Sequence, residues 1–257
     1  MDPGSGSTLD RIRHAWASGA DLYDVDPGHG LLTPDLERAW GVVLGEALGS
    51  ESLEVLDVGT GTGFLAVMTA QLGHQVTGVD LTPEMLAGAR TRAQRAGVEV
   101  LWQEGDAMAL PFDDASYDAV ISRHVLWTMT DPATAFREWM RVVRPGGRVF
   151  WFDSLHPRHG LEVRLRRWGA ALARRLQRQP DRAAPHHYTA DLYGRLPLRG
   201  ITSTAPIVAE LAALGISDVS FRPLRALRRA EQRSLPLYKR IGHGGTRYVG
   251  SFTAPRG

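Results

Sequence analysis

The sequence predicts an α/β fold in which helices cover a parallel sheet. Two observations predict this class. From Leu53 onwards, short apolar runs alternate with amphipathic stretches of helical spacing, and the first apolar run leads into a glycine-rich turn followed by a helix. The composition agrees, because 43% of the 257 residues are hydrophobic and 23% are charged, which indicates a globular chain with a sizeable core.

The alternating pattern predicts five strands and three helices in this core. The strands are expected over residues 53–59, 75–80, 98–104, 117–122 and 148–153, and the helices over residues 64–71, 83–96 and 132–143. Ahead of them, residues 8–48 predict two helices separated by an irregular loop over residues 21–30. Thr33 is expected to cap the second of these helices, with Pro34 at its first position.

The periodicity changes after Asp153. A basic helix is predicted over residues 161–178, with an apolar stripe on one face and arginines on the other. The Pro-, His- and Gly-rich residues 179–202 predict irregular structure or a lid, followed by a helix over residues 206–214 and strands over residues 219–227 and 246–254. We therefore divide the chain into a helical cap (1–50), the core (51–154), a basic helix with a lid insertion (155–202), and a C-terminal helix with two strands (203–257).

The net charge of +2 conceals an asymmetry. Residues 1–154 carry a net charge of −11 and residues 155–257 a net charge of +13. The simplest interpretation is that the two parts attract each other within one globule. The alternatives are an arginine-lined site for an acidic substrate, or a surface for nucleic acid or a membrane.

Cysteine usage and hydropathy exclude several classes of protein. The chain has no cysteine, so it has no disulfide framework, no thiolate nucleophile and no Cys-ligated zinc or iron–sulfur centre. It has no apolar run of about 18 residues, as a membrane span requires, and residues 1–10 are polar and Gly/Ser-rich, unlike a secretory leader. We expect a soluble, cytoplasmic protein.

One motif indicates a nucleoside-type ligand. Residues 57–63 read Asp-Val-Gly-Thr-Gly-Thr-Gly, and glycines in such a turn let a ligand lie directly on the main chain. Asp57 is placed to face a ligand ammonium, Asp80 ends the second predicted strand where a carboxylate can accept from ribose hydroxyls, and Asp106 follows the third strand where it can accept from an adenine amino group. Dinucleotide-binding enzymes use a similar loop. Asp80 as a helix cap and Asp106 as a turn residue are the structural alternatives.

Together with Leu110-Pro111-Phe112, Tyr117-Asp118 and Arg144-Pro145-Gly146-Gly147, this motif resembles the class I S-adenosylmethionine-dependent methyltransferases, in their small-molecule, methyltransferase type 11-like branch. The resemblance covers residues 53–154. It implies a Rossmann-like, seven-stranded, mostly parallel sheet with an antiparallel closing strand, N-terminal helices, and a helical or irregular lid insertion after the fifth strand. It also implies S-adenosyl-L-methionine as cofactor and S-adenosyl-L-homocysteine as product.

The same resemblance implies a set of cofactor-binding residues. Gly59, Thr60 and Gly61 would back the methionine part, Asp80 would hold the ribose, and Leu81 and Met85 would flank the sugar and adenine. Trp16 and Tyr23 resemble an N-terminal segment that closes over the methionine end, although such an aromatic pair also suits a core. The full set is Trp16, Tyr23, Asp57, Gly59, Thr60, Gly61, Asp80, Leu81, Met85, Asp106, Ala107 and Arg123.

His124 is the first candidate for a catalytic base, because the segment after the fourth strand faces the acceptor in this family. A structural role for His124 at the methionine end of the cofactor is the alternative. Further candidates lie in and beyond the fifth strand, and Trp127, Trp151 and Phe152 could line an acceptor pocket or fill the core. The spacing of the histidines does not suggest a metal site. These further candidates are Asp153, His156, His159, His186, His187 and Tyr188.

The resemblance predicts methyl transfer to oxygen, nitrogen or carbon of a small molecule, and the family branch suggests natural-product tailoring. The acceptor could be acidic, and a homodimer is compatible with the apolar stripe. DNA amine methylation is disfavoured because Ser122-Arg123-His124-Val125 replaces the Asn/Asp-Pro-Pro-aromatic turn of those relatives. The alternatives are a cofactor-binding protein that catalyses another reaction such as a cyclisation, an RNA methyltransferase, and a nicotinamide oxidoreductase.

Overall fold

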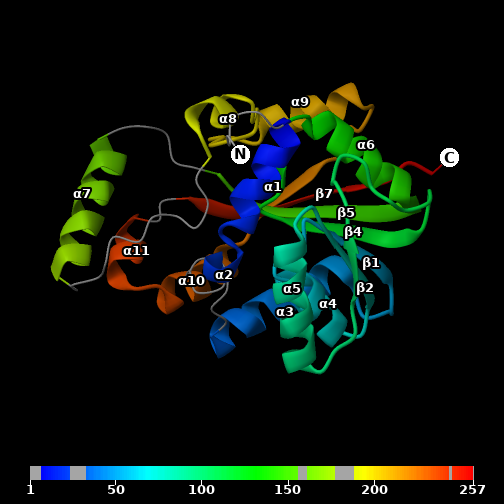
Figure 1. Cartoon of the computed structure of the whole chain (residues 1–257), viewed down its shortest axis with the longest axis horizontal. Coiled ribbons are helices and arrows are strands. Elements are labelled where there is room, and N and C mark those ends of the chain that lie inside the picture. The colour runs from blue at the N-terminus through cyan, green and yellow to red at the C-terminus, as the bar shows by residue number, and fades with distance from the viewer. Residues whose placement is uncertain (1–6, 24–32, 156–160, 177–187, 243–244, 257) are drawn as a thin grey trace.

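The computed structural model describes residues 7–23, 33–155, 161–176, 188–242 and 245–256 (Figure 1). The chain begins with three helices, α1 (Thr8–Ala17), α2 (Ala20–Tyr23) and α3 (Pro34–Leu48). Strands and helices then alternate as β1 (Glu54–Val58), α4 (Phe64–Gln71), β2 (Gln75–Asp80), α5 (Pro83–Ala96), β3 (Leu101–Glu104), β4 (Tyr117–Arg123), the 3-10 helix η1 (Leu126–Thr128), α6 (Pro132–Val142) and β5 (Val143–Leu155). The remaining elements are α7 (Leu161–Leu176), α8 (Ala190–Gly194), α9 (Ala205–Ala213), β6 (Ser220–Pro223), α10 (Arg225–Ser234), α11 (Leu237–Gly242) and β7 (Thr246–Thr253).

The strands form a seven-stranded sheet in the order β3-β2-β1-β4-β5-β7-β6. Strands β1 to β5 pair in parallel, whereas β7 runs antiparallel to both β5 and β6. The strand order reverses between β1 and β4, and in open α/β sheets ligands bind at such a switch point, at the carboxyl ends of the strands. The predicted fold class is therefore confirmed.

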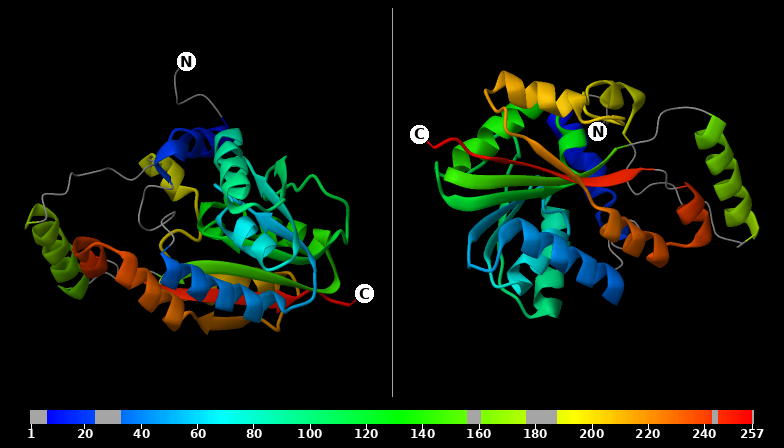
Figure 2. Two further views of the ribbon diagram at one scale, coloured as in Figure 1. Left: turned by 90° about the horizontal axis from the view of Figure 1, so that it is seen from below. Right: turned by 180° about the vertical axis from the view of Figure 1, so that it is seen from behind.

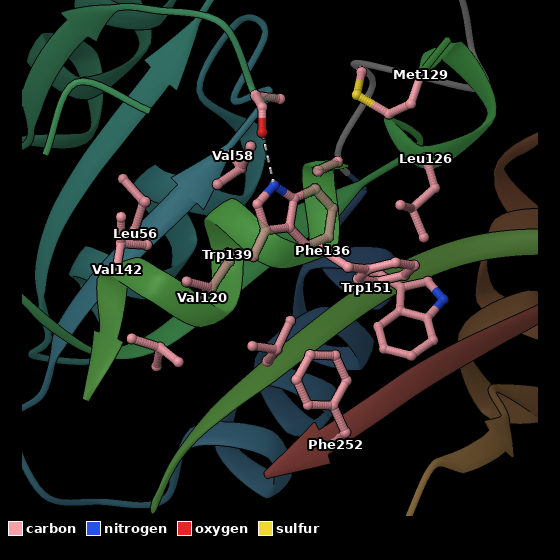
Figure 3. Close-up of a cluster of buried hydrophobic side chains, with 14 of the residues drawn as sticks. Leu56, Val58, Val120, Leu126, Met129, Phe136, Trp139, Val142, Trp151 and Phe252 are labelled. Carbon is pink, nitrogen blue, oxygen red and sulfur yellow. Dashed lines mark hydrogen bonds between the residues drawn. The ribbon is translucent and has the colours of Figure 1, made fainter. Parts of the chain in front are cut away.

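Helices cover both faces of this sheet (Figure 2). On one face, α6 and α9 bury a cluster that includes Phe136, Trp139 and Trp151, shown in Figure 3. On the other face, α3, α4 and α10 bury a second cluster around Trp40 and Phe64. A third, smaller cluster joins α1 to α8 above the carboxyl ends of the strands and contains Ile12 and Tyr188. The first two clusters fix the sheet, and the third holds the N-terminal helices over it.

The predicted core elements are confirmed, with small shifts at their ends. The third strand begins at Leu101, and β5 begins at Val143, so that the residues predicted to stop the preceding helix lie inside the strand. The predicted loop over residues 21–30 contributes to α2, and its residues 24–30 lie outside the described part of the chain. Of the predicted lid, residues 188–202 are described and contain the short helix α8.

The prediction of one strand over residues 219–227 was wrong in its second half. Strand β6 ends at Pro223, and helix α10 begins at Arg225. Leu224, Leu227 and Ala230 recur at helical spacing and are buried against α3 and the sheet. Proline lacks the N–H that a longer strand would need, and the apolar spacing beyond it suits a helix. Helix α11 was not predicted.

Within the part of the chain that the structure describes, we find no helix that is both long and apolar enough to cross a membrane.

Candidate active site

The glycine-rich turn after β1 lies at the switch point of the sheet. Gly59 and Gly61 have φ angles of 64° and 56°, in the left-handed region that glycine adopts most easily. A Cβ atom at Gly59 would come within 2.3 Å of Val125 Cγ2, whereas a Cβ at Gly61 would meet no atom within 4 Å. Gly59 is therefore required for packing, and Gly61 leaves open space next to the main chain.

Asp57 lies beneath this turn and organises it. Its Oδ2 atom accepts hydrogen bonds from the Thr60 hydroxyl (2.7 Å) and from the Ala66 backbone N–H (3.0 Å). The residue is only 1% exposed, and burial raises the pKa of Asp57 to about 7, against the lowering effect of these two bonds. The carboxyl expected to face a ligand ammonium thus also holds the turn to the start of α4.

Asp80 connects the turn after β1 to the end of β2. Its two carboxylate oxygens accept from different backbone groups, Oδ2 from Gly61 N–H (2.8 Å) and Oδ1 from Thr82 N–H (2.9 Å). Burial raises the pKa of Asp80 above its usual value, although these bonds favour the ionised form. Each oxygen has a second lone pair, so the carboxylate can still accept from ligand hydroxyls.

The turn after β3 places Asp106 and Ala107 in the lining of the same cleft. Asp106 Oδ1 accepts from the Met108 backbone N–H (2.9 Å), which fixes the turn. The Ala107 carbonyl accepts from the indole Nε1–H of Trp139 (3.2 Å), the hydrogen bond drawn in Figure 3. The hydrophobic core under α6 therefore sets the position of this turn.

A cleft with about 720 Å³ of space lies between these turns and the N-terminal helices. Trp16 and Tyr23 line it from α1 and α2, and their rings meet edge to face at 6.0 Å between centroids. Asp57 and Thr60 line a smaller cavity that shares Gly59, Gly61, Tyr23 and Arg123 with the cleft. The predicted residues in the main cleft are Trp16, Tyr23, Gly59, Gly61, Asp80, Leu81, Met85, Asp106, Ala107, Arg123 and His124. The structure thus brings together the twelve predicted cofactor-binding residues and His124.

Arg123 ends β4 and lines both cavities. Its guanidinium lies 4.0 Å from the ring centroid of Phe64 and 5.7 Å from that of Trp40. Burial lowers the pKa of Arg123, although arginine stays protonated at any physiological pH. A partly buried cation beside the glycine turn can bind an anionic group of a ligand.

His124 has a strained backbone with a φ angle of 60°, which is uncommon outside glycine. Its imidazole lies in a set of polar side chains that we call the His124 network: His124, Asp153, Ser154, Glu231 and Arg247. His124 Nδ1 is 3.3 Å from Asp153 Oδ1, and Nε2 is 3.0 Å from Arg247 Nη1. Arg247 also donates to Ser154 Oγ and, at 2.9 Å, to Glu231 Oε2.

These contacts indicate the tautomer of His124. A guanidinium can only donate hydrogen bonds, so Nε2 of His124 must accept from Arg247. The proton of the neutral ring then lies on Nδ1, which donates to the Asp153 carboxylate. Both ring nitrogens are thus engaged by protein groups, one of them a cation.

The other predicted candidates have different surroundings. Trp151 and Phe152 are 1% and 2% exposed and belong to the core. Trp127 and Tyr188 stack with Trp16 in an aromatic group next to the cleft, with centroid distances of 5.8–6.3 Å. No group of three or more His, Cys, Asp and Glu side chains that could hold a metal ion occurs among the residues described. The remaining candidates, His156, His159, His186 and His187, lie outside the described residues.

Sequence analysis missed Arg247 and Glu231. Arg247 lies near the start of β7 and reaches His124 because β7 pairs with β5, with Arg247 opposite Ser154. Glu231 lies on α10, whose first residues were predicted as strand and for whose remainder no element was predicted. No local pattern identifies either residue, because their contacts depend on the register of the closing strand. Thr128 and Met129, which follow β4 and line the cleft, were also missed.

Comparison with known proteins agrees with this geometry. The family model described as a methyltransferase domain matches residues 56–151, which run from β1 to β5. The core of this chain is thus similar to a methyltransferase domain, which agrees with the type 11-like resemblance predicted from the sequence. A SAM-dependent methyltransferase from Methanosarcina mazei has the same fold, with a TM-score of 0.58 over 88% of this chain and 99% of that chain at 18% identity.

Relatives of the methyltransferase domain extend along much of the chain. The demethylmenaquinone methyltransferase of Roseiflexus castenholzii is 40% identical over 164 residues, which are 62% of this chain and 65% of the relative. The enzyme of the same name from Deinococcus radiodurans is 35% identical over 58% of this chain and 63% of its own length. The chain therefore spans less than two thirds of these curated relatives.

The fold of the methyltransferase domain also matches solved structures. The cyclase SpnF superposes with a TM-score of 0.66 over 98% of each chain, at 18% sequence identity. At this identity the likeness shows a shared fold, here over nearly the whole length of the chain.

Proposed function

We propose that this chain is an S-adenosylmethionine-dependent methyltransferase that methylates oxygen, nitrogen or carbon of a small-molecule acceptor. The observation that supports it best is the convergence of three turns on one cleft: the glycine turn after β1, Asp80 after β2 and Asp106 after β3. Each offers the kind of group that the methionine, ribose and adenine parts of the cofactor need. The match of residues 56–151 to the methyltransferase domain supports the same conclusion.

The cleft fits the cofactor in its donor set. Gly61 leaves the main chain accessible, Asp80 has lone pairs for the ribose hydroxyls, and Arg123 supplies a partly buried cation for a carboxylate. The bound cofactor would supply a methyl group already activated by its sulfonium.

What remains for the protein is alignment of the acceptor and exclusion of water. Apolar side chains from α1 and from the segment after β4 line the cleft beside the polar turns, which favours an acceptor with an apolar body. The name of the curated relatives, demethylmenaquinone methyltransferase, supports a small organic acceptor in the same way. The apolar lining residues are Leu9, Ile12, Val125 and Met129.

For His124 the contacts support the structural role more than the role of a base. Its Nε2 lone pair is directed at Arg247, so His124 could take a proton from an acceptor only after this contact is broken. We therefore infer that His124 positions the end of β4 and orients the acceptor. An acceptor that must lose a proton would lose it to water or to a group of its own.

Acceptor-dependent formation of S-adenosylhomocysteine tests the proposal. The purified chain is incubated with S-adenosylmethionine and metabolite extracts, including extracts rich in secondary metabolites, and products are sought by mass spectrometry. We expect a product that is heavier by one methylene unit, with one S-adenosylhomocysteine formed per product, and less of both with Asp80→Ala when S-adenosylmethionine is below saturation. A product of unchanged mass formed without S-adenosylhomocysteine would instead support the cyclase-type alternative.

A further inference from the structure

Helix α7 packs on the rest of the protein through its smallest side chains. It lies beside α11, away from the sheet, in all the views of Figures 1 and 2. A Cβ atom at Gly169 would come within 3.3 Å of Ile241 Cγ2, so the two helices approach closely there. Ala173 is buried at 8% exposure. The face of α7 that contacts the protein is therefore lined by small residues.

The large apolar side chains of α7 remain exposed beside this contact face. Leu165, Trp168, Leu172 and Leu176 are 59%, 69%, 45% and 76% exposed. Their spacing of three or four residues places them on one side of the helix. We call these four residues the α7 stripe. Amphipathic helices of globular proteins normally turn such a stripe towards the core, and an exposed apolar stripe of this kind marks an interaction surface.

The surroundings of the α7 stripe are strongly basic. Helix α7 contains five arginines and one glutamate, within the part of the chain that has a net charge of +13. Arg164 and Arg175 are exposed, and helical geometry places both along the same edge of the stripe, next to Trp168. Tryptophan and leucine on one face with arginines alongside is the pattern of helices that lie in the interface of a membrane.

We propose that α7 docks this protein on the surface of an anionic lipid bilayer. The α7 stripe enters the interfacial region, and the arginines along its edge contact lipid phosphates and acidic headgroups. The helix lies on the membrane and does not span it. This proposal does not depend on the methyl-transfer activity, because α7 does not line the cleft.

A second copy of the chain fits the α7 stripe less well. From Leu165 to Leu176 the stripe is about 16 Å long and one helix wide. A stable interface buries about 800 Å² on each partner, which is more than four side chains offer. Two α7 helices packed stripe to stripe would also bring their arginines close together, which is unfavourable without acidic partners. A bilayer with negative headgroups complements both the charge and the narrow shape.

The test is sedimentation of the full chain with lipid vesicles. We expect binding to vesicles of phosphatidylcholine mixed with phosphatidylglycerol, and little binding to pure phosphatidylcholine. Trp168→Ser combined with Leu172→Ser should weaken binding at least about tenfold. The matched control is Leu101→Ser on β3, where the side chain is 73% exposed on a different part of the molecule.

A second pair of variants tests whether the positive charge of α7 contributes to vesicle binding. Arg164→Glu with Arg175→Glu should weaken binding at least about tenfold, whereas Arg90→Glu with Arg95→Glu, which reverses two exposed charges on α5, should weaken it less than twofold. Circular dichroism and binding of S-adenosylhomocysteine verify that each variant is folded. The proposal is overturned if wild type ignores the anionic vesicles, or if the α7 and control variants behave alike. Self-association that is lost on changing Trp168 would assign the stripe to a second copy instead.

Discussion

The two ends of the cleft are built from residues at very different distances along the sequence. At the glycine-turn end, Asp57 bonds to groups 3 and 9 residues away, and Asp80 to one 19 residues away. At the other end, His124 contacts Asp153 across 29 residues and Arg247 across 123. The glycine-turn end is formed by consecutive strand–turn–helix units. The end around His124 forms only when the closing strand β7 is paired with β5.

This difference has a functional meaning. Under the proposed function, the glycine-turn end would hold the cofactor through compact local turns. The contacts at the other end draw on β7 and α10 and would orient the acceptor, so they could change without disturbing these turns.

The largest expected effect concerns the buried carboxyl at the glycine-turn end. Burial raises the pKa of Asp57 from 3.8 to about 7, so between these pH values the folded state holds a proton that the unfolded chain has released. The contribution of Asp57 to stability therefore falls as the pH rises through this window. Asp57→Asn removes the buried charge, and its amide oxygen can accept both existing bonds. We expect it to raise the free energy of unfolding at pH 8 by up to about 4 kcal/mol.

Denaturant unfolding of both proteins between pH 5 and pH 8 measures this. The advantage of Asp57→Asn should grow as the pH rises from 5 to 7 and level off above pH 7, because the unfolded carboxyl is already ionised at pH 5 while the folded one loses its proton only near pH 7. A stability difference that stays constant with pH would show that Asp57 is ionised throughout.

The next effect compares two glycines of one turn. Gly59→Ala places a methyl group against Val125 and forces alanine into a left-handed conformation, which together cost about 3 kcal/mol of stability. Gly61→Ala has the same backbone penalty without the contact, so it should cost only about 1 kcal/mol. Thermal unfolding distinguishes them. Equal destabilisation would mean that Val125 moves aside, and that the turn and the segment after β4 are less tightly coupled than their packing implies.

Asp80→Ala should affect binding more than folding. It removes the acceptor for Gly61 N–H and Thr82 N–H and the carboxylate expected at the ribose. We expect S-adenosylhomocysteine to bind about 1–3 kcal/mol more weakly in calorimetry. The exposed Glu84, on the first turn of α5, gives a matched control as Glu84→Ala, which should bind as wild type does. Unchanged affinity of Asp80→Ala would refute the ribose assignment.

The smallest expected effect lies at the opposite end. Arg247→Gln removes the positive charge that donates to His124 Nε2. Glu231→Gln removes the negative charge that accepts a hydrogen bond from Arg247 and so tests whether Glu231 holds Arg247 in place. Once an acceptor is known, Arg247→Gln should lower kcat roughly tenfold through loss of alignment, with S-adenosylhomocysteine affinity nearly unchanged. Glu231→Gln should have a weaker effect in the same direction. If His124 were instead a base whose lone pair Arg247 blocks, Arg247→Gln would raise kcat. The acidic limb of the plot of kcat against pH would then also shift.

The sequence predicted the glycine-turn end well because the residues that form it lie in short continuous motifs. Gly59, Asp80 and Asp106 each follow an apolar run, and the order of such runs in a parallel sheet brings their ends to one edge. Arg247 could not be found in this way, because no local pattern shows which residues of β5 lie opposite which residues of β7. The first residues of α10 were predicted as strand because residues 219–227 were taken as one apolar run, whereas Pro223 and the helical spacing of Leu224, Leu227 and Ala230 favour a helix from there on.

The hydrogen bond from Trp139 to the Ala107 carbonyl has a consequence for anyone who redesigns this protein. One indole group links the interior of the domain to the rim where the nucleobase is expected. Replacing this indole to gain thermal resistance would remove the bond that holds that rim. A substitution of the fully buried Trp139 would therefore change both the stability of the domain and the position of the turn at Ala107.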